Sequence, residues 1–484
     1  MDAPGCKSAS TKEPLGSMAD RPNVLLIVYD TARADGFEPY AKGRETPTMS
    51  QLASRGLAYP KAIAPSCWTV PSHAAFFLGS PPRSVGLSRA PKGRGDLCRT
   101  VIESQRDKLL PEVLRRNGYA TAAVSANVWI SEANGFGTGF DRFQDVSRTR
   151  VAKMSAPGLR GRLDWYLQAL QAKTDDGASA VEGLLGEWLA ARGPAPFFWF
   201  VNLIECHSPY LPPKPTNDLG PLERVRAAED ARRYQTLEGV LRVVSTGRGL
   251  PERSVERMRH LYQRSIELMD GWLARVLEAF DRHGILDETV VLVTSDHGEN
   301  FGENNLIGHA GSLDDRLLSV PLVGAGPGLP AHAPDVTSLV DLPRLVATAV
   351  GLDEHPWGPP STPGIGIAQY DGPIPPDHPG LQQVRDWGAT PHGLERLTMR
   401  FTCATDGTLK LVHSDAGERL YDLDADPLEV TAVDASSYPA DRIEPLRDAV
   451  RRALDDGWDP VVDDEIPKSR DDDLEERMRL LGYL

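Results

Sequence analysis

The fold is decided by the stretch Asn23-Val24-Leu25-Leu26-Ile27-Val28-Tyr29-Asp30, an unbroken apolar run that ends at a carboxylate. A run of this kind is typical of a strand that helices cover on both faces. Residues 197–204 and 289–294 form two further runs of the same type, and each also ends at ionisable side chains. The pattern predicts an α/β fold with a mostly parallel central sheet and helices on both faces.

These three predicted strands bring ionisable side chains to one edge of the sheet. Asp30 follows the first strand, Glu205 and His207 follow the second, and Asp296 and His297 follow the third. In open parallel sheets, ligands bind beyond the carboxyl ends of the strands. We therefore expect one shared site at this edge rather than three separate surface features.

The rest of the pattern divides the chain into four parts. Residues 254–283 form an amphipathic segment, and Gly284 is a typical helix stop. From residue 398 the pattern changes to two short strands around the turn Asp406-Gly407, a strand at 420–423 and a helix at 443–454. We expect a flexible leader at 1–20, a catalytic α/β domain at 21–390, a small C-terminal α+β subdomain with an antiparallel sheet and a helix at 391–460, and an acidic tail at 461–484.

The composition of the 484 residues is that of an ordinary globular protein, with 40% hydrophobic and 25% charged residues. The net charge of -15 disfavours a nucleic acid as the partner, because such binding needs Lys and Arg to neutralise phosphates. The sequence has neither the apolar core of a secretory signal nor a stretch that is long enough to span a membrane, so we expect a cytoplasmic protein without a membrane partner. The five scattered cysteines show neither a disulfide framework nor a zinc-ribbon spacing, which fits reduced thiols. The oligomeric state is left open.

Residues 66–79 are predicted to form a loop that enters a short helix. Pro71 suits the first turn of that helix, and Gly79 suits its end. Thr69 then lies at or just before the helix N-terminus, where free N–H groups and the helix dipole favour an anion. A threonine hydroxyl is a poor nucleophile at neutral pH, but coordination to a divalent cation lowers its pKa and fixes its direction of attack.

Asp30, Asp296 and His297 could supply that cation with two carboxylate oxygens and one imidazole nitrogen, and Thr69 could be a fourth ligand. This mixed set favours Mn, Zn or Fe over Ca, whose ligands are oxygens. The expected partner is then a small-molecule anionic ester that binds at the metal and at the helix end.

Six segments of the sequence carry a family pattern when they are taken together. They are Pro22-Asn23-Val24-Leu25-Leu26-Ile27-Val28-Tyr29-Asp30-Thr31-Ala32-Arg33-Ala34-Asp35, Trp68-Thr69-Val70-Pro71-Ser72-His73, His207-Ser208-Pro209-Tyr210, Ser295-Asp296-His297-Gly298-Glu299, Gly308-His309, and Leu420-Tyr421-Asp422-Leu423 with Asp426-Pro427. In this order, and from about residue 21 to the C-terminus, the chain resembles the sulfatase branch of the alkaline phosphatase superfamily.

The departures from the sulfatase pattern bear on the chemistry. Sulfatases carry a Cys or Ser that becomes formylglycine in a Cys/Ser-x-Pro-x-Arg motif, whereas Thr69 stands at that Cys and His73 at that Arg. Threonine cannot form the aldehyde, and Cys67 lies two positions out of register. Thr31 replaces the second Asp of the family's Asp-Asp pair, and His297 replaces the Asn of its later Asp-Asn pair. A Thr nucleophile with an Asp-His pair resembles the superfamily's phosphodiesterases and phosphonate monoester hydrolases, which favours phosphorus esters.

His207, His309 and Glu205 form a second constellation. In single-metal relatives, the residues that match His207 and His309 contact the ester oxyanion or protonate the leaving group. In two-metal relatives, acidic and imidazole groups in this part of the site hold a second ion, so Glu205, His207 and His309 are candidates for a second metal site. The spacing of Glu205 to His207 does not match the two-metal pattern, and one metal is therefore favoured over two.

The candidates also have simpler explanations: Asp30 and Thr69 as helix caps or turn formers, His73 as a polar residue of the first helical turns, His207 as part of a turn, and His309 as part of a surface loop. The coincidence of all of them favours a site. Asn127, which follows an expected strand at 120–124, and Arg33 are weaker candidates for substrate binding. A loop asparagine and a helix start with an Arg33–Asp35 salt bridge explain these two equally well.

The sequence thus predicts a metal-dependent hydrolase of a phosphate monoester, a phosphate diester or a phosphonate ester that works through a covalent intermediate on Thr69. His309 or His207 would protonate the leaving oxygen, with His73 as a further catalytic candidate, and water would resolve the intermediate. Three alternatives stay open: a sulfatase without formylglycine, a phospho-group transferase, and a non-catalytic binding protein on the same scaffold.

Overall fold

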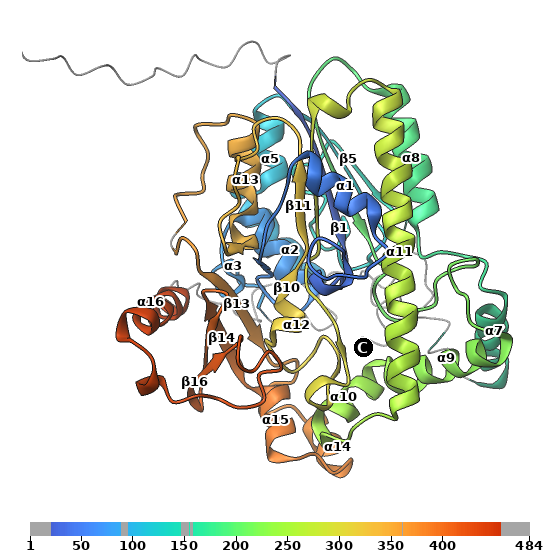
Figure 1. Cartoon of the computed structure of the whole chain (residues 1–484), viewed down its shortest axis with the longest axis vertical. Coiled ribbons are helices and arrows are strands. Elements are labelled where there is room, and N and C mark those ends of the chain that lie inside the picture. The colour runs from blue at the N-terminus through green and yellow to red at the C-terminus, as the bar shows by residue number, and fades with distance from the viewer. Residues whose placement is uncertain (1–20, 89–94, 147–153, 155–157, 361, 456–484) are drawn as a thin grey trace, which may run out of the picture.

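The computed structural model describes residues 21–88, 95–146, 154, 158–360 and 362–455. A large α/β layered unit carries a small antiparallel sheet on one side (Figure 1). The expected leader at 1–20, the acidic tail at 461–484 and the last five positions of the expected subdomain, 456–460, lie outside the described residues.

The central sheet has seven strands in the described part of the chain. In spatial order they are β2 (Leu57–Ala58), β11 (Leu322–Ala325), β7 (Thr289–Thr294), β1 (Asn23–Tyr29), β6 (Phe197–Leu203), β4 (Ala120–Ser125) and β5 (Arg142–Asp145). β11 runs antiparallel to β7 and β2, whereas β7, β1, β6, β4 and β5 run parallel to one another. The three predicted strands are confirmed as neighbours in the middle of the sheet, with β1 between β6 and β7.

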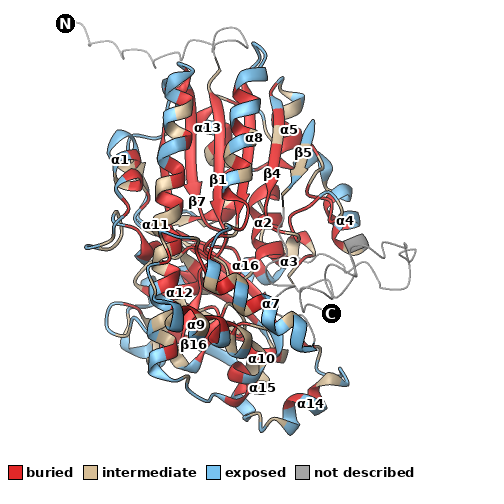
Figure 2. Cartoon of the chain, turned by 90° about the vertical axis from the view of Figure 1, so that its right-hand side faces the viewer, coloured by how far each residue is buried: buried red, intermediate tan, exposed pale blue. Residues whose placement is uncertain are grey.

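Both faces of this sheet are covered by helices, as the continuous apolar runs require. Val24, Leu26 and Val28 of β1 pack into one core, and the alternate residues Leu25, Ile27 and Tyr29 pack into the other. The first core is closed by α2 (Thr69–Leu78), α5 (Leu110–Arg116) and α13 (Leu342–Ala349), and the second by α1 (Pro47–Arg55), α8 (Ala178–Ala191) and α11 (Glu252–Arg282) (Figure 1). Figure 2 shows the strands as a buried layer behind the half-exposed helices α8 and α11. The predicted α/β fold class is confirmed.

The small sheet consists of β13 (Gly366–Asp371), β14 (Arg400–Thr405), β15 (Leu409–Ser414) and β16 (Gly417–Asp422), all antiparallel. The helix α16 (Ala440–Asp455) packs on it through Ile443, Leu446 and Val450. The predicted hairpin, third strand and helix are present. The sheet also takes its first strand, β13, from before residue 390, and the division of the chain into domains stays a prediction.

The remaining strands are short, and the remaining α-helices connect the elements already described. They are β3 (Ala62–Ile63), β8 (Asn300–Phe301), β9 (Ile307–Gly308), β10 (Ser319–Val320), β12 (Thr337–Ser338), α3 (Pro82–Val85), α4 (Gly95–Ser104), α7 (Gly158–Gln171), α9 (Pro221–Tyr234), α10 (Leu237–Thr246), α12 (Asp315–Leu318), α14 (Gly380–Asp386) and α15 (Pro391–Thr398). Within the described ranges, none of the helices combines the length and the apolar character that crossing a membrane requires.

Candidate active site

Strand register brings the two candidate carboxylates together. β1 and β7 are parallel neighbours, and Val28 of β1 pairs with Thr294 of β7. Asp30 and Asp296 each come two residues after this pair, so both side chains arise at the same level of the carboxyl edge. His297 follows directly, and Thr69 is the first residue of α2, which packs on the same sheet.

The four side chains form a tight, buried cluster. Asp30, Asp296 and His297 each offer a ligand atom, and these atoms lie within 4.8 Å of one another. His297 Nε2 lies 3.4 Å from Asp296 Oδ2 and 3.9 Å from Asp30 Oδ1. Thr69 Oγ1 lies 3.4 Å from the same His297 nitrogen. Asp30, Asp296 and His297 are fully buried, and Thr69 is 4% exposed.

The electrostatics of the cluster fit a bound cation. Among the described residues, Asp30 Oδ1 and Asp296 Oδ2 have no hydrogen-bond partner, although both are buried. Burial and the neighbouring charge of Asp30 raise the pKa of Asp296 well above its ordinary value, and burial raises the pKa of Asp30 as well. Two such carboxylates become stable as anions when a divalent cation lies between them. The donor set therefore fits a metal ion.

The imidazole of His297 is also oriented in a way that fits a bound cation. Its Nδ1 donates to the Gly298 carbonyl at 3.0 Å, so its Nε2 carries the lone pair and faces Thr69 and the two carboxylates. Burial and the nearby His309 lower the pKa of His297 well below its ordinary value, which keeps the ring neutral. A neutral imidazole held by a carbonyl on its far nitrogen is the usual form of a metal-binding histidine.

Thr69 occupies the helix position that the sequence predicts. The ten-residue helix α2 begins at Thr69, and the preceding Trp68 supplies no side-chain cap. The helix ends at Gly79, whose φ of +65° lies in the left-handed region. A side chain at this glycine would also meet the Trp357 ring at 2.5 Å. The N-terminal end of α2 thus points its dipole toward the cluster.

His207 and His309 lie at the rim of this cluster. Their ring centroids are 5.2 Å apart, and the His309 ring is 4.6 Å from the His297 ring. His309 Nδ1 contacts Glu299 Oε1 at 3.2 Å, and Tyr210 donates to the other Glu299 oxygen at 2.6 Å. Burial lowers the pKa of His309, but the charge and hydrogen bond of Glu299 outweigh this effect and the pKa is raised. Glu299 therefore orients the His309 ring and favours its protonated form.

Glu205 binds the backbone at the start of α8. Its Oε1 accepts a hydrogen bond of 2.6 Å from the Ala178 N–H at the start of α8. Burial and the nearby Asp176 raise the pKa of Glu205 to about 8. Among the described residues, the one group of three or more side chains with metal-ligand spacing is Asp30, Asp296 and His297. The structure therefore does not bring Glu205, His207 and His309 together as a second group of ligands.

His73 is enclosed rather than exposed to a substrate. Its Nδ1 lies 3.0 Å from the Thr69 carbonyl and 3.5 Å from Asp296 Oδ2. The ring is fully buried among the aromatic side chains of Phe76, Phe77, Phe136 and Phe200. Burial lowers its pKa to about 3, so the ring is neutral. The geometry gives His73 contacts through which it can fix Thr69 and Asp296.

The two weaker substrate candidates have protein partners. Asn127 donates to Asp30 Oδ2 at 2.5 Å and accepts from the Trp129 N–H at 2.8 Å, which fixes the carboxylate. Arg33 pairs with Asp35 at 2.6 Å and with Glu303 at 3.0 Å. The alternative explanation for Arg33, a salt-bridged helix start, describes this contact.

Sequence reasoning missed the roles of Glu299, Tyr210 and Thr31. Thr31 has a φ of +62°, donates to the Cys206 carbonyl at 2.7 Å, and uses its N–H to bind Asp296 Oδ1 at 3.2 Å. All three residues stand inside or directly beside the quoted family segments. Their position in those segments was the available signal, but Tyr210 and Thr31 have partners far away in the sequence, and Glu299 contacts both Tyr210 and the nearer His309.

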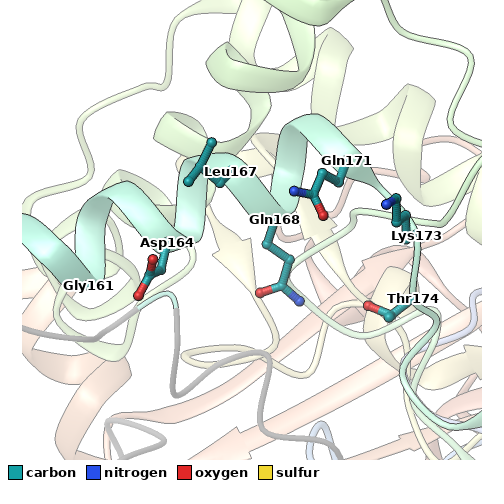
Figure 3. Close-up of a pocket in the computed structure, with 7 residues that line it drawn as sticks. All are labelled: Gly161, Asp164, Leu167, Gln168, Gln171, Lys173 and Thr174. Atoms are coloured by element: carbon teal, nitrogen blue, oxygen red, sulfur yellow. The ribbon is translucent and has the colours of Figure 1, made fainter.

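A separate cavity of about 520 Å³ lies along α7, away from the cluster. Its lining consists of Gly161, Asp164, Leu167, Gln168 and Gln171 of α7, followed by Lys173 and Thr174 (Figure 3). None of the candidate catalytic or metal-binding residues is part of this lining. The cavity is therefore separate from the buried cluster.

A buried, metal-fitting cluster with a threonine hydroxyl beside it, at the carboxyl edge of a parallel sheet, fits a hydrolase of anionic esters. The chain belongs to the sulfatase family, whose family model matches residues 22–352. This membership bears out the predicted resemblance to sulfatase-like enzymes of the alkaline phosphatase superfamily. The protein is accordingly an enzyme that hydrolyses sulfuric or phosphoric esters.

Individual relatives are similar at low identity. A sulfatase of Formosa agariphila is 25% identical over 348 residues, which is 66% of this chain and 67% of that protein. The multifunctional alkaline phosphatase superfamily protein PehA of Trinickia caryophylli is 24% identical over 369 residues, or 65% of this chain and 70% of the relative. The crystal structure of a phosphonate monoester hydrolase of Agrobacterium radiobacter has a TM-score of 0.58 at 19% identity, covering 90% of this chain and 95% of that one. The similarity to the phosphonate monoester hydrolase structure is a similarity of fold.

Proposed function

We propose that the chain is a metal-dependent hydrolase of phosphate or phosphonate esters that uses Thr69 as its nucleophile. The observation that carries this proposal is the position of Thr69 Oγ1, 3.4 Å from His297 Nε2 in a buried cluster with two carboxylates. The substrate is a small anionic ester. The phosphonate monoester hydrolase and the multifunctional protein PehA among the similar proteins support this substrate class.

Asp30, Asp296, His297 and Thr69 would hold one divalent metal ion, with Mn, Zn or Fe favoured over Ca because one ligand is an imidazole. Such an ion lowers the pKa of the threonine hydroxyl and draws charge from the ester oxygens. Asn127 and His73 position this set. Asn127 holds Asp30 by a hydrogen bond, and His73 holds the backbone of Thr69.

In the first step, Thr69 transfers the phosphoryl group from the ester to itself. Its hydroxyl proton leaves to solvent, Oγ1 forms a bond to phosphorus, and the bond from phosphorus to the leaving oxygen breaks. The electron pair of that bond goes to the leaving oxygen, which takes a proton from His309. We favour His309 over His207 as this acid because Glu299 holds its Nδ1 and raises its pKa. His207 contacts the ester oxyanion.

In the second step, water attacks the phosphothreonine. His309, now neutral, takes the proton of the water as its oxygen bonds to phosphorus, and the bond to Thr69 Oγ1 breaks. The electron pair of that bond goes to Oγ1, which takes a proton from solvent and regenerates the threonine hydroxyl. The products are the free acid and the leaving alcohol. In the transferase alternative, an acceptor alcohol takes the place of this water.

Hydrolysis of a sulfate ester is the second candidate. The family membership and the similar sulfatase of Formosa agariphila favour it. Thr69, which cannot become formylglycine, argues for the phosphorus ester instead. A non-catalytic binding role is disfavoured because a scaffold without catalysis has no need of both the ligand set and a nucleophile.

The test is turnover of nitrophenyl phosphate, a nitrophenyl phosphodiester, a nitrophenyl phosphonate and nitrophenyl sulfate by chelated protein to which Mn, Zn or Ca is returned. We expect turnover of at least one phosphorus ester with Mn or Zn, and little with Ca. Turnover of the sulfate alone would reverse the ranking of the two candidates. Product analysis in water that contains a primary alcohol separates the hydrolase from the transferase.

A further inference from the structure

The loop after β16 in the small sheet reaches across to the segment that supports the metal site. Arg316 donates to the carbonyls of Pro427 and Leu428, at 3.3 Å each, and its side chain is only 6% exposed. Asn304 also donates to the Leu428 carbonyl at 2.8 Å. The small sheet is thus bonded to the chain between β8 and β10.

A buried ion pair completes this contact. Lys410 Nζ lies 2.7 Å from Glu429 Oε2, and the two side chains are 0% and 2% exposed. Lys410 also donates to the Leu313 carbonyl, and the other Glu429 oxygen accepts from the Asp315 N–H at 2.5 Å. Each charged group therefore contacts both its partner and the backbone of residues 313–315. We call Lys410, Glu429 and the carbonyls of Pro427 and Leu428 the C-terminal clamp.

The clamped segment supports Gly298, which follows the metal ligand His297. Gly298 donates to the Leu317 carbonyl at 2.8 Å, and a side chain at Gly298 would meet the Arg316 carbonyl at 2.0 Å. The backbones of residues 298 and 316 are therefore in direct contact. The Gly298 carbonyl, in turn, accepts the hydrogen bond from His297 Nδ1 that turns the ring toward the cluster.

We propose that the C-terminal clamp positions the metal ligand His297 through residues 313–317 and Gly298. The small sheet then takes part in building the active site, and Lys410 and Glu429 are positioning residues for it. This inference rests on the metal site of the proposed function but not on the chemistry of Thr69. Partners that orient a metal ligand commonly change metal affinity by about 10–100-fold when they are removed. The clamp contacts residues 313–315 and not His297 itself, so we expect a smaller loss of metal affinity, about 3–10-fold.

The experiment measures Mn²⁺ binding to the chelated full-length protein by titration calorimetry. Glu429→Gln keeps the acceptor for the Asp315 N–H but removes the charge, and we expect its Mn²⁺ Kd to rise about 3–10-fold. The matched control is Glu418→Gln, which removes an exposed ion pair with Arg447 in the same sheet. We expect the Kd of this control to equal that of the wild type.

Arg316→Lys supplies the second variant, because it keeps the charge beside Asp314 but loses the bonds to the Pro427 and Leu428 carbonyls. If Glu429→Gln yields no folded protein, the Mn²⁺ Kd of Arg316→Lys tests the inference instead. Folded variants that melt at lower temperature and bind Mn²⁺ like the wild type would overturn the inference, because they would show a merely structural clamp. Failure of the wild type itself to bind Mn²⁺, Zn²⁺ or Fe²⁺ would instead overturn the metal site of the proposed function. Loss of turnover in Thr69 variants leaves this binding test unaffected.

Discussion

Two regions of the molecule bury charged groups, and they treat those charges in opposite ways. At the carboxyl edge of the central sheet, two carboxylates lie together, and one oxygen of each has no hydrogen-bond partner among the described residues. In the C-terminal clamp, Lys410 and Glu429 face each other at 2.7 Å, and backbone groups satisfy their other positions. The comparison teaches that burial alone does not mark a reactive site. Buried like charges without partners are the stronger mark, because they resist ionisation unless a cation or a proton neutralises them.

The pKa directions express the same contrast. Burial lowers the pKa of Lys410, but the Glu429 carboxylate outweighs burial, and the pKa is raised so that the ammonium stays charged. Burial raises the pKa of Glu429 as well, and the charge of Lys410 opposes this rise. Burial and the charge of Asp30 raise the pKa of Asp296, so this carboxylate resists ionisation. The clamp thus pairs its charges within the chain, whereas the carboxylates of the cluster would be paired by the proposed cation.

The largest effect is expected from Thr69→Ala, which leaves the charges of the cluster but removes its nucleophile. We expect kcat/KM for a nitrophenyl phosphate or phosphonate ester to fall by about 10³-fold or more, as is usual when a nucleophile is removed. The phosphothreonine seen by intact-mass analysis of acid-quenched wild type should disappear. The control is Ser72→Ala, a buried hydroxyl of the same helix that bonds the Ser66 carbonyl at 3.2 Å and should leave turnover unchanged. A Thr69→Ala protein with its metal and full turnover would remove Thr69 from the mechanism.

The sequence predicted the cluster better than the clamp, and the reason is physical. Asp30 and Asp296 end apolar runs, and parallel strands carry such ends to one edge of the sheet, so their meeting followed from local patterns. The roles of Glu299 and Asn127 depend on side-chain direction in loops, which no periodicity encodes. The pairing of Lys410 with Glu429 depends on how a small sheet packs against a distant loop.

The same limit applies to the outline of the small sheet. Its hairpin and helix have strong local signals, in the turn Asp406-Gly407 and in the apolar period of α16. Its first strand, β13, stands alone in a segment rich in Pro and Gly and is defined by its pairing with β14. A strand of this kind becomes recognisable only when its partner is known.

The next largest effect is expected from breaking the Lys410–Glu429 ion pair of the C-terminal clamp. Lys410→Met leaves the Glu429 carboxylate buried without its partner, and we expect the free energy of unfolding to fall by about 3–5 kcal/mol. Urea denaturation of the chelated protein measures this loss. Arg447→Met, which breaks an exposed pair, should cost about 0–1 kcal/mol. The double variant Lys410→Met/Glu429→Gln, which keeps the acceptor for the Asp315 N–H, should regain most of the stability, and a double variant as unstable as the single one would contradict the ion-pair explanation.

At the buried cluster we expect a substitution to raise stability rather than lower it, in the metal-free protein. The folded-state pKa of Asp296 is raised above its ordinary value of 3.8, so the metal-free protein loses stability as the pH rises above that value. Asp296→Asn removes this loss and keeps the acceptor for the Thr31 N–H. We expect the metal-free variant to unfold at higher temperature than the metal-free wild type at pH 8, and to match it at low pH.

With metal added, this order should reverse, because the wild type gains stability by binding the ion and Asp296→Asn binds it poorly. Thermal melts of both proteins with and without Mn²⁺ measure the two effects. Asp287→Asn serves as the control, since its carboxylate is 91% exposed and pairs only at the surface. A metal-free Asp296→Asn protein that is less stable at pH 8 than the wild type would mean that Asp296 is satisfied by the chain alone.

The smallest effect is expected from Glu299→Gln. Glu299 pairs with His309, and the His309 ring lies beside His297 of the buried cluster. Its carboxylate raises the pKa of His309 in spite of burial, and the proposed acid must be protonated to act. Without the charge the pKa of His309 falls, so the decline of kcat on the alkaline side should begin at lower pH and reach about tenfold there. Tyr210→Phe, which removes the other hydrogen bond to Glu299 but not its charge, should keep the wild-type alkaline limb. Identical pH profiles for Glu299→Gln and the wild type would transfer the acid role from His309 to His207, whose Nδ1 contacts the Ser208 carbonyl rather than a carboxylate.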